Sequence, residues 1–230
     1  MSRRVVVTGG TRGIGAAIAA RFAAAGDEVV AIGRAECDIT DEAAVAALFE
    51  RAGPVDVLVN NAGVSDSAPL ERTTLAAWHS QLDVNATGAF LCTRAALPGM
   101  RERGSGRIVT VASTAGVIGA RYTAAYTASK HAAVGLVRAV AAEVAGTGVT
   151  ANAVCPTFVR TDMTRESVQR IAAATGRSEA EGEAALAAAS PLGRLLEPDE
   201  VAFAVAFLAA PEAGAINGQT LILDGGGIQA

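Results

Sequence analysis

The chain of 230 residues contains a single lysine, Lys130, although nineteen of its side chains are lysine or arginine. Aromatic residues make up only 4% of the chain, and both tyrosines, Tyr122 and Tyr126, stand close to that lysine. A chain that uses arginine almost everywhere for a surface cation does not need lysine for that purpose. Lysine offers a compact ammonium, whereas arginine offers a planar fork. The segment YTAAYTASKH, residues 122–131, is therefore a candidate site.

Cysteine and excess positive charge are also scarce. The three cysteines, Cys37, Cys92 and Cys155, are far apart and odd in number, which argues against a disulfide framework or a zinc site. The net charge of -4 argues against a nucleic-acid or anionic membrane surface. The N-terminal apolar run is too short for a signal peptide, and no run is long enough to span a bilayer. We expect a cytoplasmic protein with no metal, membrane or nucleic-acid partner.

Short β-branched runs alternate with alanine-rich stretches along the chain. The β-branched runs are nearly all apolar, which is typical of buried strands in a parallel sheet with helices on both faces. We expect a Rossmann-type α/β fold, a doubly wound parallel sheet, as one domain over 1–230. Strands are expected at 4–9, 28–33, 55–63, 106–113, 148–156 and 219–225, and helices at 14–25, 41–52, 74–100, 124–145 and 198–209. Residues 162–195 lack a strand-like run and predict one or two small helices, either a substrate lid or a solvated structural pair.

A glycine-rich turn follows the first expected strand. VVVTGGTRGIG places Gly9, Gly13 and Gly15 where the strand turns into the first helix. Glycine there permits a tight turn and close approach of a phosphate, and the helix N-terminus supplies free N–H groups. The alternative is an ordinary strand-to-helix connection, but the position after the first strand of a doubly wound sheet favours a dinucleotide site.

The end of the second expected strand indicates which dinucleotide binds. An acidic residue there would accept hydrogen bonds from a free ribose 2′-hydroxyl, but the chain has Gly33 followed by Arg34. Arg34 and Arg12 together suit a 2′-phosphate, which favours NADP over NAD. A solvated Arg34 and the nearby Glu36 keep NAD open as the alternative.

Tyr126 and Lys130 are one helical turn apart and can share one face of a helix. An ammonium about 5 Å from a phenol lowers the pKa of the phenol by roughly two units, which suits proton transfer to a carbonyl oxygen. A YxxxK pattern alone often arises by chance.

Two further polar residues are candidates for the same site. Ser113 ends a strand and is either an oxyanion donor or a turn serine. Asn85 lies in a helical stretch, where asparagine usually caps or kinks.

Taken together, these residues resemble the short-chain dehydrogenase/reductase family, over nearly the whole chain. The matching motifs are TGGTRGIG at 8–15, NNAG at 60–63 and YTASK at 126–130, with Ser113 thirteen residues before Tyr126. The resemblance implies a catalytic tetrad in which Tyr126 is the acid/base and Ser113 polarises the carbonyl. In the same scheme Lys130 also holds the nicotinamide ribose, and Asn85 keeps a proton-relay water in place.

The resemblance also implies contacts to the cofactor. Besides Tyr126 and Lys130, these are Gly9, Thr11, Arg12, Gly13, Ile14, Gly15, Arg34, Asp38, Ile39, Asn61, Ala62, Gly63, Pro156, Val159 and Thr161. Two departures from the family pattern matter. Thr157 replaces the usual glycine after Pro156, and only three residues separate Arg34 from Asp38. Because a parallel crossover needs a dozen residues or more, the crossover helix between the second and third strands of the family must be missing here and the third strand shortened or absent.

The implied activity is transfer of a hydride between NADP and a ketone or secondary alcohol, in a homotetramer or dimer. YTASKHAAVGL and SPLGRLLEPDEVA look similar to segments of 3-oxoacyl, hydroxybutyrate and polyketide ketoreductases, and residues 114–124 with Phe158 and Met163 predict an apolar pocket wall. The alternatives are an NAD-dependent secondary-alcohol or 3-hydroxyacyl dehydrogenase, an epimerase-like enzyme, and a non-catalytic NADP-binding regulator. A metal hydrolase built on His79 and His131 is weaker, since the two histidines are isolated.

Overall fold

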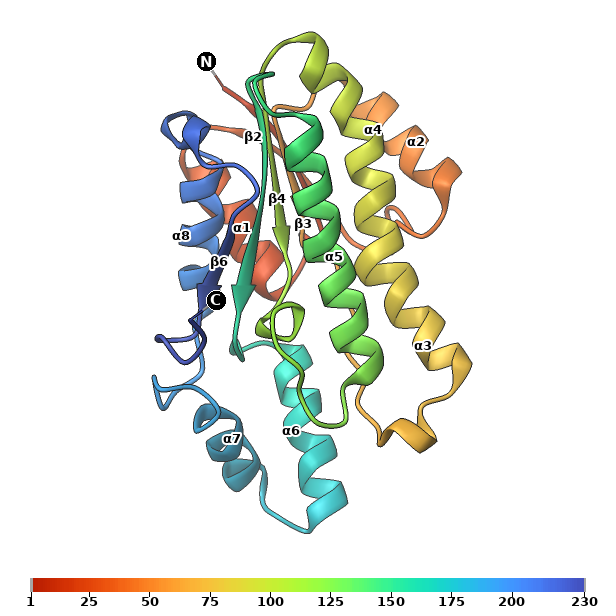
Figure 1. Ribbon diagram of the computed structural model, residues 1–230, viewed down its shortest axis with the longest axis vertical. Coiled ribbons are helices and arrows are strands. Elements are labelled where there is room, and N and C mark those ends of the chain that lie inside the picture. Colours follow the sequence, from red (N-terminus) through yellow and green to blue (C-terminus); the bar gives the residue numbers. More distant parts are fainter. Residues whose placement is uncertain (1, 230) are drawn as a thin grey trace.

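A six-stranded parallel sheet forms the centre of the computed structural model, which describes residues 2–229 (Figure 1). The strand order is β2-β1-β3-β4-β5-β6, and every neighbouring pair is parallel. The strands are β1 (Arg4–Thr8), β2 (Glu28–Ile32), β3 (Val57–Asn60), β4 (Gly106–Val111), β5 (Val149–Pro156) and β6 (Thr220–Leu223). Each expected strand run contains one of them, and the overall fold prediction is confirmed.

The burial of the strands explains their composition. Val5, Val6 and Val7 of β1 have no exposed surface, and every residue of β3 and β5 is buried. Strands covered on both faces need apolar side chains at successive positions rather than at alternate ones. β2 and β6 form the two edges of the sheet and are less buried.

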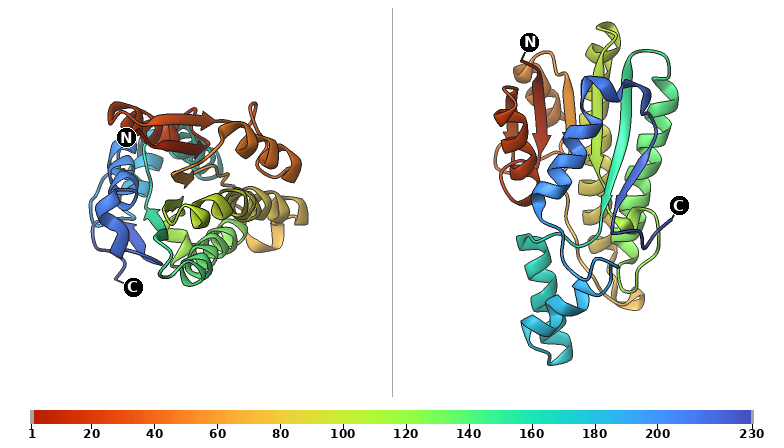
Figure 2. Two further views of the ribbon diagram at one scale, coloured as in Figure 1. Left: turned by 90° about the horizontal axis from the view of Figure 1, so that it is seen from above. Right: turned by 90° about the vertical axis from the view of Figure 1, so that its left-hand side faces the viewer.

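Helices cover both faces of the sheet (Figures 1 and 2). α1 and α8 pack against each other on one face, and α2, α4 and α5 lie on the other. Their bounds are α1 (Gly13–Ala24), α2 (Glu42–Ala52), α4 (Gly88–Glu102), α5 (Ala124–Glu143) and α8 (Pro198–Leu208). Short 3-10 turns complete the connections at η1 (Leu70–Arg72), η3 (Thr114–Gly116) and η4 (Pro211–Ala215). Two separate apolar clusters result, one on each side of the sheet.

The helical stretch expected at 74–100 is not uniform. It consists of α3 (Leu75–Leu82), a π-helical turn η2 (Asp83–Thr87) and α4. The expectation of one regular helix is therefore wrong at its centre. A π turn inserts one extra residue per turn, and such turns often occur at functional sites. Asn85 lies in the middle of it and is buried.

Residues 33–41, between β2 and α2, form turns and contain neither helix nor strand. β2 is consequently an edge strand. The chain enters α2 through the Asp41 cap, whose carboxylate accepts hydrogen bonds from the N–H groups of Ala43 at 2.8 Å and Ala44 at 3.2 Å.

Residues 162–195 include two helices, α6 (Asp162–Thr175) and α7 (Glu179–Ala187). They pack against each other and lie beyond the carboxyl ends of the strands (Figure 1). Across residues 2–229, no helix is both long enough and apolar enough to cross a membrane. The same residues contain no cluster of three or more His, Cys, Asp or Glu side chains placed to hold a metal ion.

Candidate active site

The glycine turn between β1 and α1 tolerates no larger residues at its key positions. Gly9 and Gly13 have positive φ values of 62° and 52°, which side chains with a Cβ rarely adopt. At Gly15 a Cβ would lie 2.0 Å from the carbonyl oxygen of Gly9 and 2.5 Å from Asn61 Nδ2. The turn therefore requires glycine, at positions 9 and 13 for its conformation and at position 15 for its packing.

Asn61 and Thr8 join this turn to the end of β3. Asn61 Nδ2 donates to the carbonyl oxygens of Thr8 at 3.0 Å and Gly9 at 3.1 Å. In return, Thr8 Oγ1 accepts from the backbone N–H of Asn61 at 3.0 Å and of Ala62 at 3.1 Å. Asn61 and Ala62, both expected at the cofactor, thus lie against the glycine turn.

The N-terminus of α1 is open to an anion. Its N-cap residue Arg12 has an extended backbone, and its side chain makes no capping hydrogen bond. The first turn of the helix has no acidic residue. Unpaired N–H groups and the helix dipole favour a phosphate there. Thr161 faces this turn, because its Cγ2 lies 3.4 Å from the place that a Cβ on Gly13 would take. The glycine cradle and the uncapped helix fit the pyrophosphate of a dinucleotide.

At the end of β2, Arg34 pairs with Asp38 rather than with another group of the turn. Arg34 Nη2 lies 3.6 Å from Asp38 Oδ2, and the guanidinium side chain is 89% exposed. Asp38 Oδ1 also accepts from the N–H of Thr40 at 3.0 Å and its hydroxyl at 2.7 Å. These hydrogen bonds, and then Arg34, lower the pKa of Asp38. The sequence argument did not include this pairing. The neighbouring Ile39 is buried and packs against Gly88.

Tyr126, Lys130 and Ser113 meet at the carboxyl end of β4. Lys130 Nζ donates to the carbonyl oxygen of Val111 at 3.1 Å and lies 5.8 Å from the centroid of the Tyr126 ring. Ser113, just after β4, caps η3 by accepting from the N–H of Ala115 at 3.1 Å. The helix α5 therefore carries the phenol and the ammonium to the strand end where Ser113 lies.

Asn85 connects this group to the segment after β3. Its Oδ1 accepts from the N–H of Val64 and its Nδ2 donates to the carbonyl oxygen of Val64, both at 2.9 Å. Nδ2 also donates to Ser129 Oγ at 2.9 Å. A Cβ on Gly63 would lie 3.1 Å from Asn85 Oδ1 and 3.4 Å from Lys130 Nζ. All four candidate catalytic residues thus belong to one site, which the π turn η2 helps to form.

Burial controls the acid–base properties of Tyr126 and Lys130. It lowers the pKa of Lys130 to about 8. It also raises the pKa of Tyr126 above its ordinary value, although the neighbouring Ser113 hydroxyl acts in the opposite direction. The expectation of a phenol pKa below its ordinary value is therefore wrong, because loss of hydration is the largest effect on the pKa of Tyr126.

The segment after β5 brings the remaining expected cofactor residues to the same edge. Pro156 is the last residue of β5, Val159 is buried, and Thr161 is the N-cap of α6. The carbonyl oxygen of Val159 accepts from Thr164 Oγ1 at 2.6 Å. Residues 156–161 therefore run from the sheet edge into α6, with Thr161 facing the glycine turn.

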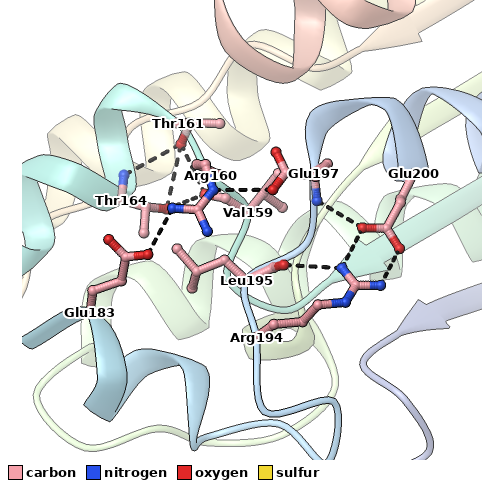
Figure 3. A network of polar contacts seen from close by, with 9 residues as sticks. All are labelled: Val159, Arg160, Thr161, Thr164, Glu183, Arg194, Leu195, Glu197 and Glu200. Carbon is pink, nitrogen blue, oxygen red and sulfur yellow. Dashed lines mark hydrogen bonds and ion pairs between the residues drawn. The ribbon is translucent and has the colours of Figure 1, made fainter. Parts of the chain in front are cut away.

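Two features of the site were missed in the sequence. Arg160 pairs with Glu183 of α7 at 2.7 Å and with Glu197 at 3.1 Å, so it joins α7 to the residue before α8 (Figure 3). Ser129 links Tyr126 and Asn85, since its hydroxyl donates to the carbonyl oxygen of Tyr126 at 2.8 Å. The ion pairs leave no local signal because their partners are distant in sequence, whereas Ser129 lies inside the YTASK motif.

Other candidates lie outside this chemistry. His131 is exposed, and its Nδ1 contacts the carbonyl oxygen of Thr127 at 2.9 Å. Tyr122 is 55% exposed and has a positive φ of 66°. Cys155 is fully buried, and burial raises the pKa of its thiol. None of the three has the setting of a proton-transfer group or a nucleophile.

A dinucleotide cradle and a tyrosine–lysine–serine group at one sheet edge define an oxidoreductase of the Rossmann type. Residues 32–227 match a family model described as Enoyl-(Acyl carrier protein) reductase. The chain is 39% identical to a putative ketoacyl reductase of Streptomyces coelicolor, covering 98% of this chain and 97% of the relative. It is 37% identical to an acetoacetyl-CoA reductase of Shinella zoogloeoides, with 98% of each covered. The chain belongs to the short-chain dehydrogenase/reductase family.

Solved structures agree with this assignment. A variant of actinorhodin polyketide ketoreductase, solved with NADPH, superposes with a TM-score of 0.87 at 37% identity, over 98% of this chain and 97% of that one. Levodione reductase superposes with a TM-score of 0.89 at 31% identity, over 97% and 96%. The likeness to this family seen in the sequence motifs therefore extends to the fold, over nearly the whole chain.

Proposed function

We propose that the protein is an NADP-dependent reductase of ketones, with 3-oxoacyl thioesters or related ketones as substrates. The observation that carries this proposal is the meeting of Tyr126, Lys130 and Ser113 at the end of β4. The names of the relatives, ketoacyl and acetoacetyl-CoA reductase, agree with a carbonyl substrate. The family model is described by an enoyl reductase, so reduction of a carbon–carbon double bond is the competing reaction.

Each catalytic residue has a role that its position supports. Tyr126 donates its phenol proton to the carbonyl oxygen as the alcohol forms, and Ser113 donates a hydrogen bond to the same oxygen. Lys130 lies beside the phenol, where its positive charge stabilises the phenolate that is left. Asn85 holds the backbone of Val64 and so fixes the segment that faces Lys130. A bound nicotinamide would supply the hydride to the carbonyl carbon.

The dinucleotide would lie across the carboxyl edge of the sheet. The uncapped N-terminus of α1 and the turn from Gly9 to Gly15 would hold the pyrophosphate. Asn61, Ala62 and Gly63 would line the middle, and Lys130 would bind the nicotinamide ribose. The other contacts expected from the sequence are Thr11, Arg12, Ile14, Arg34, Asp38, Ile39, Pro156, Val159 and Thr161. The solved relative with NADPH supports NADP as the dinucleotide.

An apolar substrate suits the rim of this site. Ile118, Phe158 and Met163 are large apolar side chains with exposed fractions of 47%, 38% and 36%. They belong to the segments that the sequence predicted as the pocket wall. Exposed apolar side chains next to a catalytic group favour a substrate with an uncharged, partly apolar body.

We infer that residues 162–195 act as a substrate lid within a single domain. Thr161, the N-cap of α6, lies next to the glycine turn, and α6 and α7 make their main contacts with each other. Arg160 ties α7 to Glu197 through exposed ion pairs (Figure 3). Such pairs are weak, about 0–1 kcal/mol, and therefore easy to break when the helices move.

We also propose that the chain lacks the helix that joins the second and third strands in its family, and lacks that third strand itself, so that α2 here leads from β2 to a strand on the other side of β1. The turns at 33–41 and the edge position of β2 support this.

An assembly of two or four copies is a further proposal. Phe203 and Phe207 of α8 are 59% and 49% exposed, and a hollow of about 650 Å³ lies between α8 and the open edge β6. The mass of the protein in solution tests the assembly.

A substrate panel tests the proposed reaction. Acetoacetyl-CoA, longer 3-oxoacyl thioesters, simple ketones and enoyl thioesters would be mixed with NADPH, and the loss of NADPH absorbance followed. We expect turnover of 3-oxoacyl thioesters or ketones. Turnover of enoyl thioesters alone would replace the proposal with the competing reaction. No turnover in either direction, with NADPH bound, would favour the non-catalytic regulator, and faster oxidation of alcohols with NAD would favour the dehydrogenase.

A further inference from the structure

The buried face of α5 carries a serine that its packing does not explain. Across α5, which the structure describes in full, Ser129 and Lys130 are the buried polar residues, and the other buried residues are alanine or valine. Ser129 has no exposed surface. Serine forms helices less readily than alanine, and a buried hydroxyl is unfavourable unless it is hydrogen-bonded. Alanine would suit position 129 better, so the hydroxyl needs a separate explanation.

The hydroxyl of Ser129 bonds in two directions. It donates to the carbonyl oxygen of Tyr126, about one turn earlier in the same helix, at 2.8 Å. It accepts from Asn85 Nδ2 at 2.9 Å, across the contact between α5 and the π turn η2. A hydroxyl has one proton, and this one is used within α5, so Ser129 is an acceptor toward Asn85. Ser129 therefore selects the nitrogen of the Asn85 amide rather than its oxygen.

This selection fixes the orientation of the Asn85 side chain, which is 3% exposed. Its Nδ2 donates both to Ser129 and to the carbonyl oxygen of Val64, and its Oδ1 accepts from the N–H of Val64. An asparagine amide has two N–H donors, and both are used here. Rotation of the amide by half a turn would place oxygen against two acceptors and nitrogen against a donor, and all three hydrogen bonds would be lost.

The Asn85 amide in turn holds the backbone beside Lys130. A Cβ on Gly63, the residue before Val64, would lie 3.1 Å from Asn85 Oδ1 and 3.4 Å from Lys130 Nζ. The backbone of residues 63–64 thus forms a wall next to the ammonium. Without the Ser129 hydroxyl, one buried N–H of Asn85 would have no acceptor, which favours a shift of the amide or of the π turn. Small shifts of groups next to the reacting atoms lower rates strongly.

We propose that Ser129 is a positioning residue, which orients Asn85 and through it fixes the backbone wall next to Lys130. Ser129 acts through these groups, because its own hydroxyl is fully used by Tyr126 and Asn85. This inference rests on the proposed function, since the ammonium that it serves lies beside the proposed proton donor.

Steady-state reduction of a 3-oxoacyl thioester by NADPH, with the full chain, measures this role. We expect Ser129→Ala to lower kcat about tenfold, with KM for the thioester and the affinity for NADPH within about twofold of wild type. Ser129→Thr keeps a hydroxyl that can bond the same helix carbonyl, and it should recover most of the loss. Thr127→Val is the matched control. It removes a hydroxyl of the same helix that contacts Thr123 at 3.0 Å rather than Asn85, and kcat should not change.

A double variant tests whether Ser129 acts through Asn85. We expect Asn85→Ala to lower kcat by about 100-fold. Adding Ser129→Ala to it should lower kcat by less than about threefold more, because the hydroxyl then has no amide to orient. Independent effects would multiply to about 1,000-fold, which would overturn the inference. A kcat of Ser129→Ala within about twofold of wild type would also overturn it.

Hydrogen exchange requires no turnover and separates this inference from the proposed function. The N–H of Val64 donates to Asn85, so in the ligand-free protein it should exchange about fivefold faster or more in Ser129→Ala than in Thr127→Val. Equal exchange in the two variants would overturn the inference. If the wild-type chain reduces no ketone but Ser129→Ala shows the faster exchange, only the proposed function is contradicted. If Ser129→Thr does not fold, the results for Ser129→Ala and the double variant decide.

Discussion

The ammonium of Lys130 lies 5.8 Å from the centroid of the Tyr126 ring and is held by the carbonyl oxygen of Val111. Lys130 is buried, with 5% of its surface exposed, in a chain whose other cations are all arginine. The position beside Tyr126 therefore has room for a compact ammonium. A planar guanidinium would need space that Val111 and Gly63 already limit.

Lys130→Arg keeps the charge but changes its shape, and we expect kcat for ketone reduction to fall by about 100-fold or more. The matched control is Arg138→Lys, an exposed position on the same helix, which should leave kcat unchanged. Steady-state kinetics on both variants make the comparison. A fully active Lys130→Arg enzyme would contradict the requirement for a compact cation.

The lowered pKa of Lys130 makes the free energy of unfolding depend on pH. The group ionises near pH 8 in the folded chain, against an ordinary value of 10.5, so the unfolded chain binds more protons between these values. The contribution of Lys130 to the free energy of unfolding therefore rises as the pH increases from 8 to 10.5, by at most about 3 kcal/mol.

Lys130→Met removes the titrating ammonium, so comparing it with wild type measures the contribution of Lys130 to stability. Denaturant unfolding of the ligand-free protein at several pH values should show Lys130→Met more stable than wild type at pH 7. The difference should shrink as the pH approaches 10. A stability difference that does not depend on pH would show that burial of Lys130 does not lower its pKa.

Gly15 tests the backbone packing of the dinucleotide cradle. We expect Gly15→Ala to lose about 3 kcal/mol or more of stability and to bind NADP⁺ poorly, because its Cβ would lie 2.0 Å from the carbonyl oxygen of Gly9. Gly135→Ala is the control, since a Cβ there meets nothing within 4 Å, and it should stabilise α5 by about 0.5–1 kcal/mol. Equal stability of the two variants would contradict the tight turn.

The sequence predicted the sheet and its parallel strands from local patterns of apolar residues, and the shared helix face of Tyr126 and Lys130 from one helical turn in YTASK. The inclusion of Asn85 and Ser113 among the candidate catalytic residues came from the family resemblance. The sequence did not predict the π turn at Asn85, whose side chain makes hydrogen bonds with Val64 and Ser129, residues that are distant in the sequence. The direction of the Tyr126 pKa shift was wrong, because spacing gives the distance between two groups but not the extent to which both lose water.

Arg160 tests the proposal that residues 162–195 form a substrate lid. Its ion pairs with Glu183 and Glu197 are exposed, so we expect Arg160→Ala to change the melting temperature little but to raise KM several-fold and to increase protease cleavage within α6 and α7. Arg165→Ala, which removes an ion pair to Asp162 within α6, is the control for charge. Unchanged KM and unchanged cleavage in Arg160→Ala would contradict a role of Arg160 in positioning the proposed lid.

Tyr126 provides the most direct test of the catalytic account, and the other tyrosine provides its control. Reduction of a 3-oxoacyl thioester would be followed for Tyr126→Phe and for Tyr122→Phe, with NADPH affinity measured separately. We expect Tyr126→Phe to lose about 100- to 10,000-fold in kcat while NADPH affinity stays similar, and Tyr122→Phe to remain active. If Tyr126→Phe turns over substrate as fast as wild type, Tyr126 is not the proton donor.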